Sequence, residues 1–481
     1  MERTVAAVAM AVAVLLTAAC AGFPPNPPLA KYDPSAGYRF ELLDQGDNSD
    51  GLFVILAFSG GGTRAAALAY GVLEALRDAR IESNGKVLSL LDEVDVISAI
   101  SGGSFPAAYY ALFGPRIFDE FLQRFLYRPI ESELIRSALS PAGLLKLTGP
   151  SFGRSDLAAE FYHREVFGAK TYADIAAQRR RPFVILNATD MTLGSQFSFT
   201  QDQFDLLCSD LSGLPVARAA AASSAFPGLL TPLTFRNYAG SCDYRQPQWV
   251  DSALKDRSSR LNAGRTARAE RRLSYAAGEP RRDYIHLIDG GVADNIGLRE
   301  PLVAVANLNH PWSVLRLINL EKVNRLAVIV VNAATDPAND RDTSAKVPGL
   351  LDTVTAAANV PLNNYSFDTL DLLRRTVNEF NESERLISGC KDLAAARGAQ
   401  CALEVPSPHR IEFFPIEVAF EYIDDPKERS WFRNLPTTFE LPRETVDRLR
   451  AAGRRILLED PNFRKLMQAL RGCVATGGAG C

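Results

Sequence analysis

The stretch LFVILAFSGGGTR, residues 52–64, determines how this chain can fold. Its first seven residues form a short, continuous apolar run, which is typical of a strand buried on both faces of a parallel sheet. Three glycines follow, and residues 64–79 are rich in Ala and Leu with helical spacing. Glycines allow positive φ angles, and the N-terminus of the next helix presents unpaired N–H groups toward negative charge. The order predicts an α/β domain with an anion-binding turn, and the missing P-loop lysine argues against a nucleotide.

A second unit of the chain has the same order. The apolar run at 94–100 leads into SGGS, residues 101–104, and a helix is expected from residue 105. A sharp strand-to-helix turn exposes a serine hydroxyl at the sheet edge, close to a helix N-terminus. Ser98 lies inside the expected strand, and Ser104 is expected to be the N-cap of the helix. Ser101 is therefore the candidate nucleophile.

A third apolar run, residues 284–288, ends in Asp289-Gly290-Gly291. Loops beyond the C-terminal ends of parallel strands line the crevice of an open α/β sheet. We therefore expect the glycine turn, Ser101 and Asp289 to converge there. Asp-Gly is also a common turn pair, so the motif alone is weak. The three motifs in this order favour a functional site over three separate structural turns.

With these motifs, the sequence resembles the patatin-like phospholipase family over roughly residues 52–298. GGGTR (60–64) looks like the glycine-rich oxyanion motif of the family, AISGG (99–103) its nucleophile elbow, and DGG (289–291) its catalytic aspartate. Residues 187–190 and 222–227 are similar to segments found between the elbow and the aspartate. Ala65 and Ala99 replace glycines that are usual in the family, and both keep a small side chain.

The resemblance implies a three-layer α/β/α fold, with helices on both faces of the sheet. It also implies a phospholipase A or lysophospholipase activity, in which a Ser101–Asp289 dyad cleaves lipid or other acyl esters through an acyl-enzyme. No metal or cofactor is expected. The residues implied for the oxyanion are Gly60, Gly61 and Gly62, with support from Arg64, Gly290 and Gly291.

Two alternatives stay open at this point. The chain order serine, aspartate and then His310 or His409 is also that of the Ser-His-Asp triad in α/β-hydrolases. Neither histidine follows a strand in an evident catalytic loop, and His163 and His286 are more simply surface and strand residues. The other alternative is an exported lipid-binding or scaffolding protein without turnover, because a fold alone does not imply an activity.

The length and charge of the chain limit its organisation and its partners. With 481 residues, 47% of them hydrophobic, it can form one large α/β domain with an extension, or two domains. The formal net charge of -3 gives no reason to expect a nucleic-acid partner. We expect a signal peptide (1–19), a Pro-rich linker (20–50), a hydrolase core (51–335) and a C-terminal α/β extension (336–481) that completes or flanks the core.

The N-terminus indicates export. An apolar run, Val5–Leu16, follows Arg3 and leads through small residues to Cys20. This arrangement resembles a bacterial lipoprotein signal, in which a lipid on Cys20 attaches the protein to a membrane surface. Ala21 stands where an aspartate is linked to inner-membrane retention, so the periplasmic side of the outer membrane is expected. The alternative is a plain secretory signal that leaves the protein periplasmic or secreted.

The remaining six of the seven cysteines fall into pairs that are close in the sequence. Six cysteines allow 15 connectivities, so local pairing is only the simplest choice. An oxidising compartment and small loops favour it. The predicted disulfides are Cys208 with Cys242, Cys390 with Cys401, and Cys473 with Cys481.

The segment 251–282 is strongly basic, with nine Lys or Arg residues against four acids, and it lacks strong apolar periodicity. This composition is typical of a solvated surface insertion. Because it leads into the strand that ends at Asp289, a lid or a contact with anionic lipid headgroups is the alternative.

Overall fold

The computed structural model describes residues 22–83, 85–255, 263–277, 281–298, 322–335, 385–398 and 411–474, with isolated positions between 345 and 382. The predicted signal segment, Cys20, His310 and His409 lie outside these ranges.

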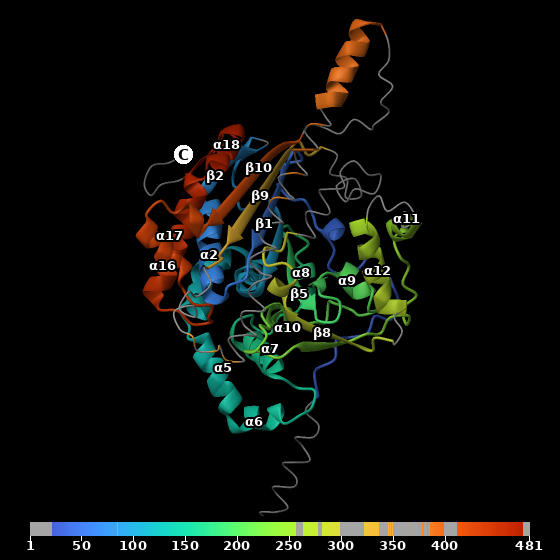
Figure 1. Ribbon diagram of the computed structural model, residues 1–481, viewed down its shortest axis with the longest axis vertical. Helices are drawn as coiled ribbons and strands as arrows, with labels where there is room; N and C mark the ends of the chain where they lie inside the picture. Colours follow the sequence, from blue (N-terminus) through green and yellow to red (C-terminus); the bar gives the residue numbers. More distant parts are fainter. Residues whose placement is uncertain are drawn as a thin grey trace, which may run out of the picture.

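Within the described residues, an eight-stranded sheet forms the centre of the molecule (Figure 1). The strand order is β10-β9-β1-β4-β5-β8-β7, and β6 pairs with β5. The strands are β1 (Leu52–Phe58), β4 (Val94–Ile100), β5 (Phe183–Asp190), β6 (Ser195–Ser198), β7 (Leu233–Arg236), β8 (Tyr284–Asp289), β9 (Arg325–Asn332) and β10 (Glu412–Ala419). A smaller sheet contains β2 (Ala79–Ser83), β3 (Lys86–Ser89) and β11 (Cys473–Val474).

Helices cover both faces of the central sheet (Figure 1), as the three-layer expectation requires. Among the described helices, none is long and apolar enough to span a bilayer. The α-helices are α2 (Gly62–Asp78), α3 (Ser104–Phe113), α4 (Ile117–Phe121), α5 (Ile130–Leu139), α6 (Pro141–Leu147), α7 (Arg154–Glu165), α8 (Tyr172–Ala176), α9 (Gln201–Asp205), α10 (Val216–Ser223), α11 (Gln248–Lys255), α12 (Ala263–Ala277), α16 (Pro426–Arg433), α17 (Arg443–Glu459) and α18 (Pro461–Ala469). Shorter helical turns are η1 (Phe40–Leu42), η2 (Ser101–Gly103), η3 (Gly114–Arg116), η4 (Leu122–Leu126), η6 (Gly290–Val292) and η8 (Phe420–Tyr422).

The expectation that Asp289 ends a parallel strand is wrong, because the sheet is mixed. Strands β10, β9, β1, β4 and β5 are parallel neighbours, whereas β8 runs antiparallel to β5. Strand β5 continues beyond the end of β4, and Asp289 pairs with Ala188 on that extension, next to Asn187, the partner of Ile100. The end of β8 therefore still reaches the level at which Ser101 leaves β4.

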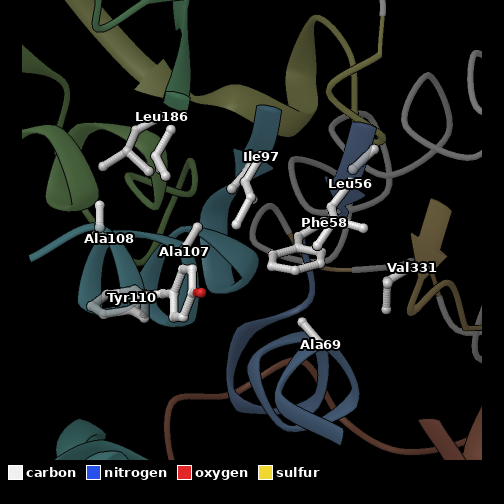
Figure 2. Packing of buried hydrophobic residues seen from close by; sticks show 14 of the residues in the cluster. Leu56, Phe58, Ala69, Ile97, Ala107, Ala108, Tyr110, Leu186 and Val331 are labelled. Atoms are coloured by element: carbon white, nitrogen blue, oxygen red, sulfur yellow. The ribbon is translucent and has the colours of Figure 1, made fainter. Parts of the chain in front are cut away.

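The core explains why the continuous apolar runs form strands. Every residue of β1 and of β4 is buried, as expected for strands covered on both faces. In Figure 2, the side chain of Phe58 in β1 points toward α2, where Ala69 lies, and Ile97 of β4 lies near Ala107 of α3. Small alanines on these helices let them approach the sheet closely.

The C-terminal extension is part of the same structure. It supplies β10, which pairs with β9 along its whole length, and α17, which packs on α2. The helices meet at two glycines: a Cβ on Gly71 would overlap the carbonyl oxygen of Arg450, and a Cβ on Gly453 would lie 2.5 Å from the carbonyl oxygen of Leu68. The contact between α2 and α17 therefore depends on the absence of side chains there.

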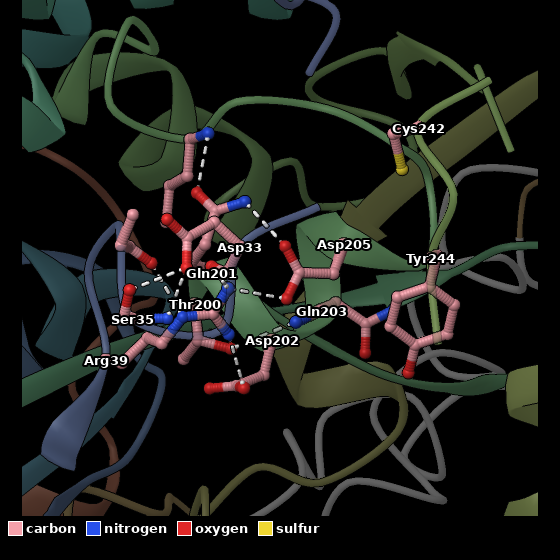
Figure 3. A network of polar contacts seen from close by, with 12 residues as sticks. Asp33, Ser35, Arg39, Thr200, Gln201, Asp202, Gln203, Asp205, Cys242 and Tyr244 are labelled. Carbon is pink, nitrogen blue, oxygen red and sulfur yellow. Dashed lines mark hydrogen bonds and ion pairs between the residues drawn. The ribbon is translucent and has the colours of Figure 1, made fainter. Parts of the chain in front are cut away.

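The N-terminal segment, expected to be a linker, packs on the core from residue 22 onward. Tyr38 is buried, and its hydroxyl accepts the N–H of Val184 at 2.7 Å. The buried Arg39 pairs with Asp202 and Asp205, both at 2.7 Å (Figure 3). An exposed linker would leave such groups in water, so this segment is a structural part of the domain.

A disulfide joins Cys208 and Cys242, the first of the three predicted pairs, with their Cα atoms 5.5 Å apart. Both cysteines are buried. Cys390 and Cys473 are also disulfide-bonded, and the partners predicted for them, Cys401 and Cys481, lie outside the described ranges.

The basic insertion is partly helical and is fixed at its end. It contains α12 and most of α11, which share a small apolar cluster formed by Val250, Ala253 and Ala269. Near its C-terminal end, Arg282 forms an ion pair with the buried Asp190 at 2.7 Å. This part of the insertion is therefore attached to the end of β5.

We predict that Gly71→Ala lowers the free energy of unfolding by about 1–3 kcal/mol, because the methyl group would overlap the backbone of α17. Chemical denaturation measures the change. The matched control is Gly389→Ala, since Gly389 is helical and a methyl group there would meet no described atom within 4 Å. Equal stability of the two variants would contradict a close contact between α2 and α17.

Candidate active site

Ser101 lies at a strained turn between β4 and α3. Its φ angle is 48°, in the left-handed region that residues other than glycine seldom adopt. Such strain persists only where the surrounding structure holds it, and it is often found at functional sites. Ser98 is buried within β4, and its hydroxyl donates to the carbonyl of Gly297 at 2.5 Å. Ser101 therefore differs from Ser98, because it lies in a strained turn at the end of the strand, whereas the Ser98 hydroxyl is engaged inside the strand.

The prediction that Ser104 is the N-cap of α3 is wrong. Ser104 is the first residue of α3, Gly103 occupies the cap position, and no side chain caps this helix. The Ser104 hydroxyl instead lies 2.8 Å from the hydroxyl of Ser223 on α10. A short 3-10 turn at residues 101–103 precedes the helix, and α3 begins at Ser104, one residue before the position that the sequence pattern predicts.

The glycine turn after β1 lies directly against the serine turn. Gly61 and Gly62 have positive φ angles of 139° and 61°. A Cβ on Gly102 would overlap the carbonyl oxygen of Gly62, so the two backbones touch. A Cβ on Gly60 would lie 3.2 Å from the Cβ of Ser101. Glycine is required here because the turns could not otherwise approach each other.

The amides of the glycine turn differ in what they can bind. The N–H of Gly60 donates to Asn295, 3.3 Å from its carbonyl oxygen and 3.2 Å from Oδ1. The N–H groups of Gly61 and Gly62 have no acceptor in the part of the chain that the structure describes. Gly60 therefore shapes the turn, whereas Gly61 and Gly62 keep donors free for an anion at the N-terminus of α2.

Asp289 is buried at the end of β8, and its backbone is held on two sides. Its N–H donates to the carbonyl of Ala225 at 3.0 Å, and its carbonyl accepts the Thr189 hydroxyl at 2.8 Å. Carboxylate Oδ1 accepts the N–H of Gly291 at 2.8 Å. Oδ2 is buried and has no hydrogen bond of ordinary geometry to any described residue. One oxygen thus orients the carboxylate, and the other is available.

The pKa of Asp289 reflects this environment. Desolvation raises the pKa to about 6, and the nearby Ser101 hydroxyl and the N–H of Gly291 oppose the rise. The Ser101 hydroxyl is therefore close enough to stabilise the ionised form, although it makes no hydrogen bond of ordinary geometry with Oδ2. A carboxyl group with a pKa near 6 can accept a proton at neutral pH and return it.

Ser223 connects the elements beneath the serine turn, a role that the sequence motifs do not predict. Its hydroxyl accepts the N–H of Ser101 at 2.8 Å and donates to the carbonyl of Asn187 at 2.6 Å. Because its proton is engaged by Asn187, Ser104 must be the donor in the contact between the two hydroxyls. Ser223 and Asn187 both lie in stretches that are similar to segments of the family. This similarity is the sequence signal that could have identified them.

Arg64 braces the glycine turn from inside the protein. Its Nε donates to the carbonyl of Ala333 at 3.0 Å, and Nη1 donates to the carbonyl of Leu435 at 2.7 Å. The third contact, from Nη2 to the hydroxyl of Thr437, measures 3.1 Å. Burial lowers the pKa of Arg64 to about 10. Its donors therefore hold the chain, rather than being directed to a substrate.

Other predicted residues have clear positions. A Cβ on Gly290 would overlap the carbonyl oxygen of Asn187, so this glycine lets the turn after β8 approach β5. His163 Nδ1 is buried without a hydrogen-bond partner in the described chain, and His286 lies 3.1 Å from the hydroxyl of Thr234. Neither of these two histidines is hydrogen-bonded to Ser101 or Asp289. The described residues contain no cluster of side chains that could hold a metal ion.

Among solved structures, the human GIVD cytosolic phospholipase A2 matches with a TM-score of 0.43 and 13% identity, covering 88% of this chain and 60% of that chain. The same human enzyme in complex with a methyl gamma-linolenyl fluorophosphonate inhibitor and terbium chloride gives 0.40 and 14%, covering 90% and 61%. VipD from Legionella pneumophila gives 0.29 and 10%, covering 94% and 72%. The chain thus spans about 60% of the length of the human protein.

No curated protein matches the sequence significantly. The patatin-like phospholipase family matches residues 56–302, which is just over half of the chain and includes both Ser101 and Asp289. The protein therefore belongs to the patatin-like phospholipase family.

Proposed function

We propose that the protein is a serine acyl hydrolase that cleaves carboxylic esters of lipids, with Ser101 as the nucleophile and Asp289 as the general base. The observation that carries this proposal is the buried carboxylate of Asp289, whose Oδ2 is free of other hydrogen bonds among the described residues and lies near the Ser101 hydroxyl. A binding protein would not need an available base beside a serine in a strained turn.

In the first half of the reaction, the Ser101 oxygen attacks the carbonyl carbon of the ester while Asp289 takes the hydroxyl proton. The negative charge of the tetrahedral intermediate develops on the former carbonyl oxygen. The N–H groups of Gly61 and Gly62, at the N-terminus of α2, are suited to bind it. Asp289 then returns the proton to the departing alcohol, which leaves an acyl-enzyme on Ser101.

Water completes the cycle through the same residues. Asp289, again ionised, takes a proton from the water as its oxygen attacks the acyl carbon. Collapse of the second intermediate releases the carboxylic acid and restores the Ser101 hydroxyl, which regains the proton from Asp289. The same donors stabilise both intermediates, so a single base and a single anion site serve the complete reaction.

For the substrate, we propose a phospholipid or lysophospholipid, in accordance with the family. We further propose that a lipid on Cys20 holds the enzyme at the periplasmic side of the outer membrane, next to such substrates. Mass spectrometry of the products formed from mixed membrane lipids would identify the headgroup and the acyl position.

We predict that Ser101→Ala lowers the turnover of a chromogenic acyl ester by at least about 10³-fold, and Asp289→Asn by about 10²–10⁴-fold. Both changes remove a group that takes part in bond making while adding no volume. Ester turnover and circular dichroism would be measured together, to separate loss of chemistry from loss of folding.

The histidines test the alternative triad. We expect His310→Ala and His409→Ala to retain turnover. Loss of turnover in a folded variant of either histidine would contradict the dyad and favour a Ser-His-Asp esterase. Unchanged turnover in Ser101→Ala would instead contradict the assignment of the nucleophile.

The pKa of Asp289 predicts a pH dependence. Asp289 must be deprotonated to act as a base, so kcat/KM should be constant above about pH 6 and should fall about tenfold per unit below it. A pH–rate profile with a soluble ester measures this limb. A rate that rises as the pH falls through 6 would mean that the protonated carboxyl is the active form.

Ser223 offers a test of how the serine turn is positioned. Ser223→Ala leaves the Ser101 N–H and the Asn187 carbonyl without a buried partner, at a cost of about 1–3 kcal/mol. We expect kcat to fall about 5–100-fold with little change in KM. The matched control is Ser224→Ala, because the Ser224 hydroxyl donates only to carbonyls of its own helix. An equal loss in both variants would contradict a positioning role.

A further inference from the structure

Four large apolar side chains lie exposed on two helices and one loop of the structure. Three are on α5 and α6, and the fourth is on the loop after α10. Their exposed fractions are 55% for Ile135, 67% for Leu139, 51% for Leu144 and 52% for Leu229. Ile135 and Leu139 are four residues apart and so share one face of α5. We refer to these four residues as the apolar rim.

Helix α5 begins beside the glycine turn. Glu131, in its first turn, accepts hydrogen bonds from the Thr438 hydroxyl and from the N–H of Phe439, the latter at 3.0 Å. The carbonyl of Thr438 in turn accepts the N–H of Thr63 at 2.8 Å. One intermediate loop therefore connects the start of α5 to the turn that holds the candidate anion site.

The loop that carries Leu229 begins next to Asp289, the proposed base. The carbonyl of Ala225 accepts the N–H of Asp289, and Leu229 follows four residues later. Arg154, the first residue of α7, donates to the carbonyl of Gly228 at 3.3 Å, which joins this loop to the start of the helix that follows α6. The apolar rim is thus connected to the site from two sides.

The surroundings of the apolar rim suit a lipid surface. Arg136 and Arg154 are exposed next to the apolar residues and can meet anionic headgroups, which an apolar protein partner would not require. The described chain starts on the same side, because a Cβ on Gly22 would lie 3.8 Å from the hydroxyl oxygen of Ser151. Cys20, the predicted lipidation site, precedes Gly22 by two residues in the sequence. In Figure 1, α5 and α6 lie at the bottom of the molecule.

We propose that the apolar rim docks onto the acyl region of a phospholipid bilayer and brings the site to the membrane surface. The role of this docking rests on the proposed function, because docking would let a lipid substrate pass from the bilayer to Ser101. Its physical basis is separate: burial of exposed leucine and isoleucine side chains in hydrocarbon is favourable, and the adjacent arginines remain at the headgroups.

Insertion can be measured without turnover. Leu139→Trp and Val87→Trp are placed in the full chain with Ser101→Ala, and mixed with phosphatidylethanolamine–phosphatidylglycerol vesicles that contain acyl-brominated lipid. Val87 is a matched control, because it is 69% exposed on β3, which pairs with β2, and Figure 1 shows β2 at the opposite end from α6. The Ser101→Ala parent, which has the three tryptophans of the sequence, gives the background quenching. We expect added quenching in the Leu139→Trp variant and none in the Val87→Trp variant. Equal quenching of both, or of neither, overturns the proposal.

A second measurement follows hydrolysis. For Leu139→Asp/Leu144→Asp, the ratio of vesicle-lipid turnover to soluble-ester turnover should fall at least about tenfold, whereas Val87→Asp should keep the ratio of the unmodified protein. All variants keep the same N-terminus, so any lipid on Cys20 contributes equally. An unchanged ratio in the double variant counts against docking.

The two measurements distinguish failure of docking from failure of the proposed function. If the unmodified protein hydrolyses neither vesicle lipid nor soluble ester, the proposed function fails, and the tryptophan pair still decides whether the apolar rim inserts. A dimer in solution that the double aspartate variant abolishes would show a second copy on the apolar rim instead, and would overturn the proposal.

Discussion

The candidate site depends on the direct contact between the backbones of two glycine-containing turns. Gly62 and Gly102 touch because neither has a side chain, and this contact brings the N-terminus of α2 next to Ser101. A methyl group at position 102 would push the two turns apart and move the free amides away from the serine. Arg64 and Thr438 hold the glycine turn from behind, while Ser223 holds the serine turn from below. The glycine turn and the serine turn are thus each held by hydrogen bonds from other elements of the structure.

Burial raises the pKa of Asp289 and also carries a free-energy penalty for the polar groups around it. Asp289 is removed from water, so its proton affinity rises into the range useful for a base. Buried hydroxyls and amides around it are hydrogen-bonded in sequence from β4 through β5 to α10, which limits the penalty for burying them. The positive φ of Ser101 adds local strain that this network must offset.

The sequence predicted the local elements well and their relations less well. The runs at 52–58 and 94–100 form strands with those bounds, because strands buried on both faces leave an unbroken apolar signal. The direction of β8, the partner of Gly60 and the role of Ser223 were not predictable, since each depends on residues about 100 or more positions away. Packing of residues 22–50 was missed for the same reason: proline-rich composition says nothing about distant partners such as Asp202 and Asp205.

The strand order also affects how the protein is made. Strand β1 lies between β4, which follows it closely in the chain, and β9, which begins at Arg325. β9 pairs in turn with β10. The side of the sheet that contains these two strands can therefore form only after the C-terminal part of the chain has been synthesised. Such a topology has a high contact order and favours slow folding with a long-lived open sheet edge. Strand β1 therefore exposes one row of unpaired backbone N–H and C=O groups until residues 325–332 have been synthesised and can pair with it.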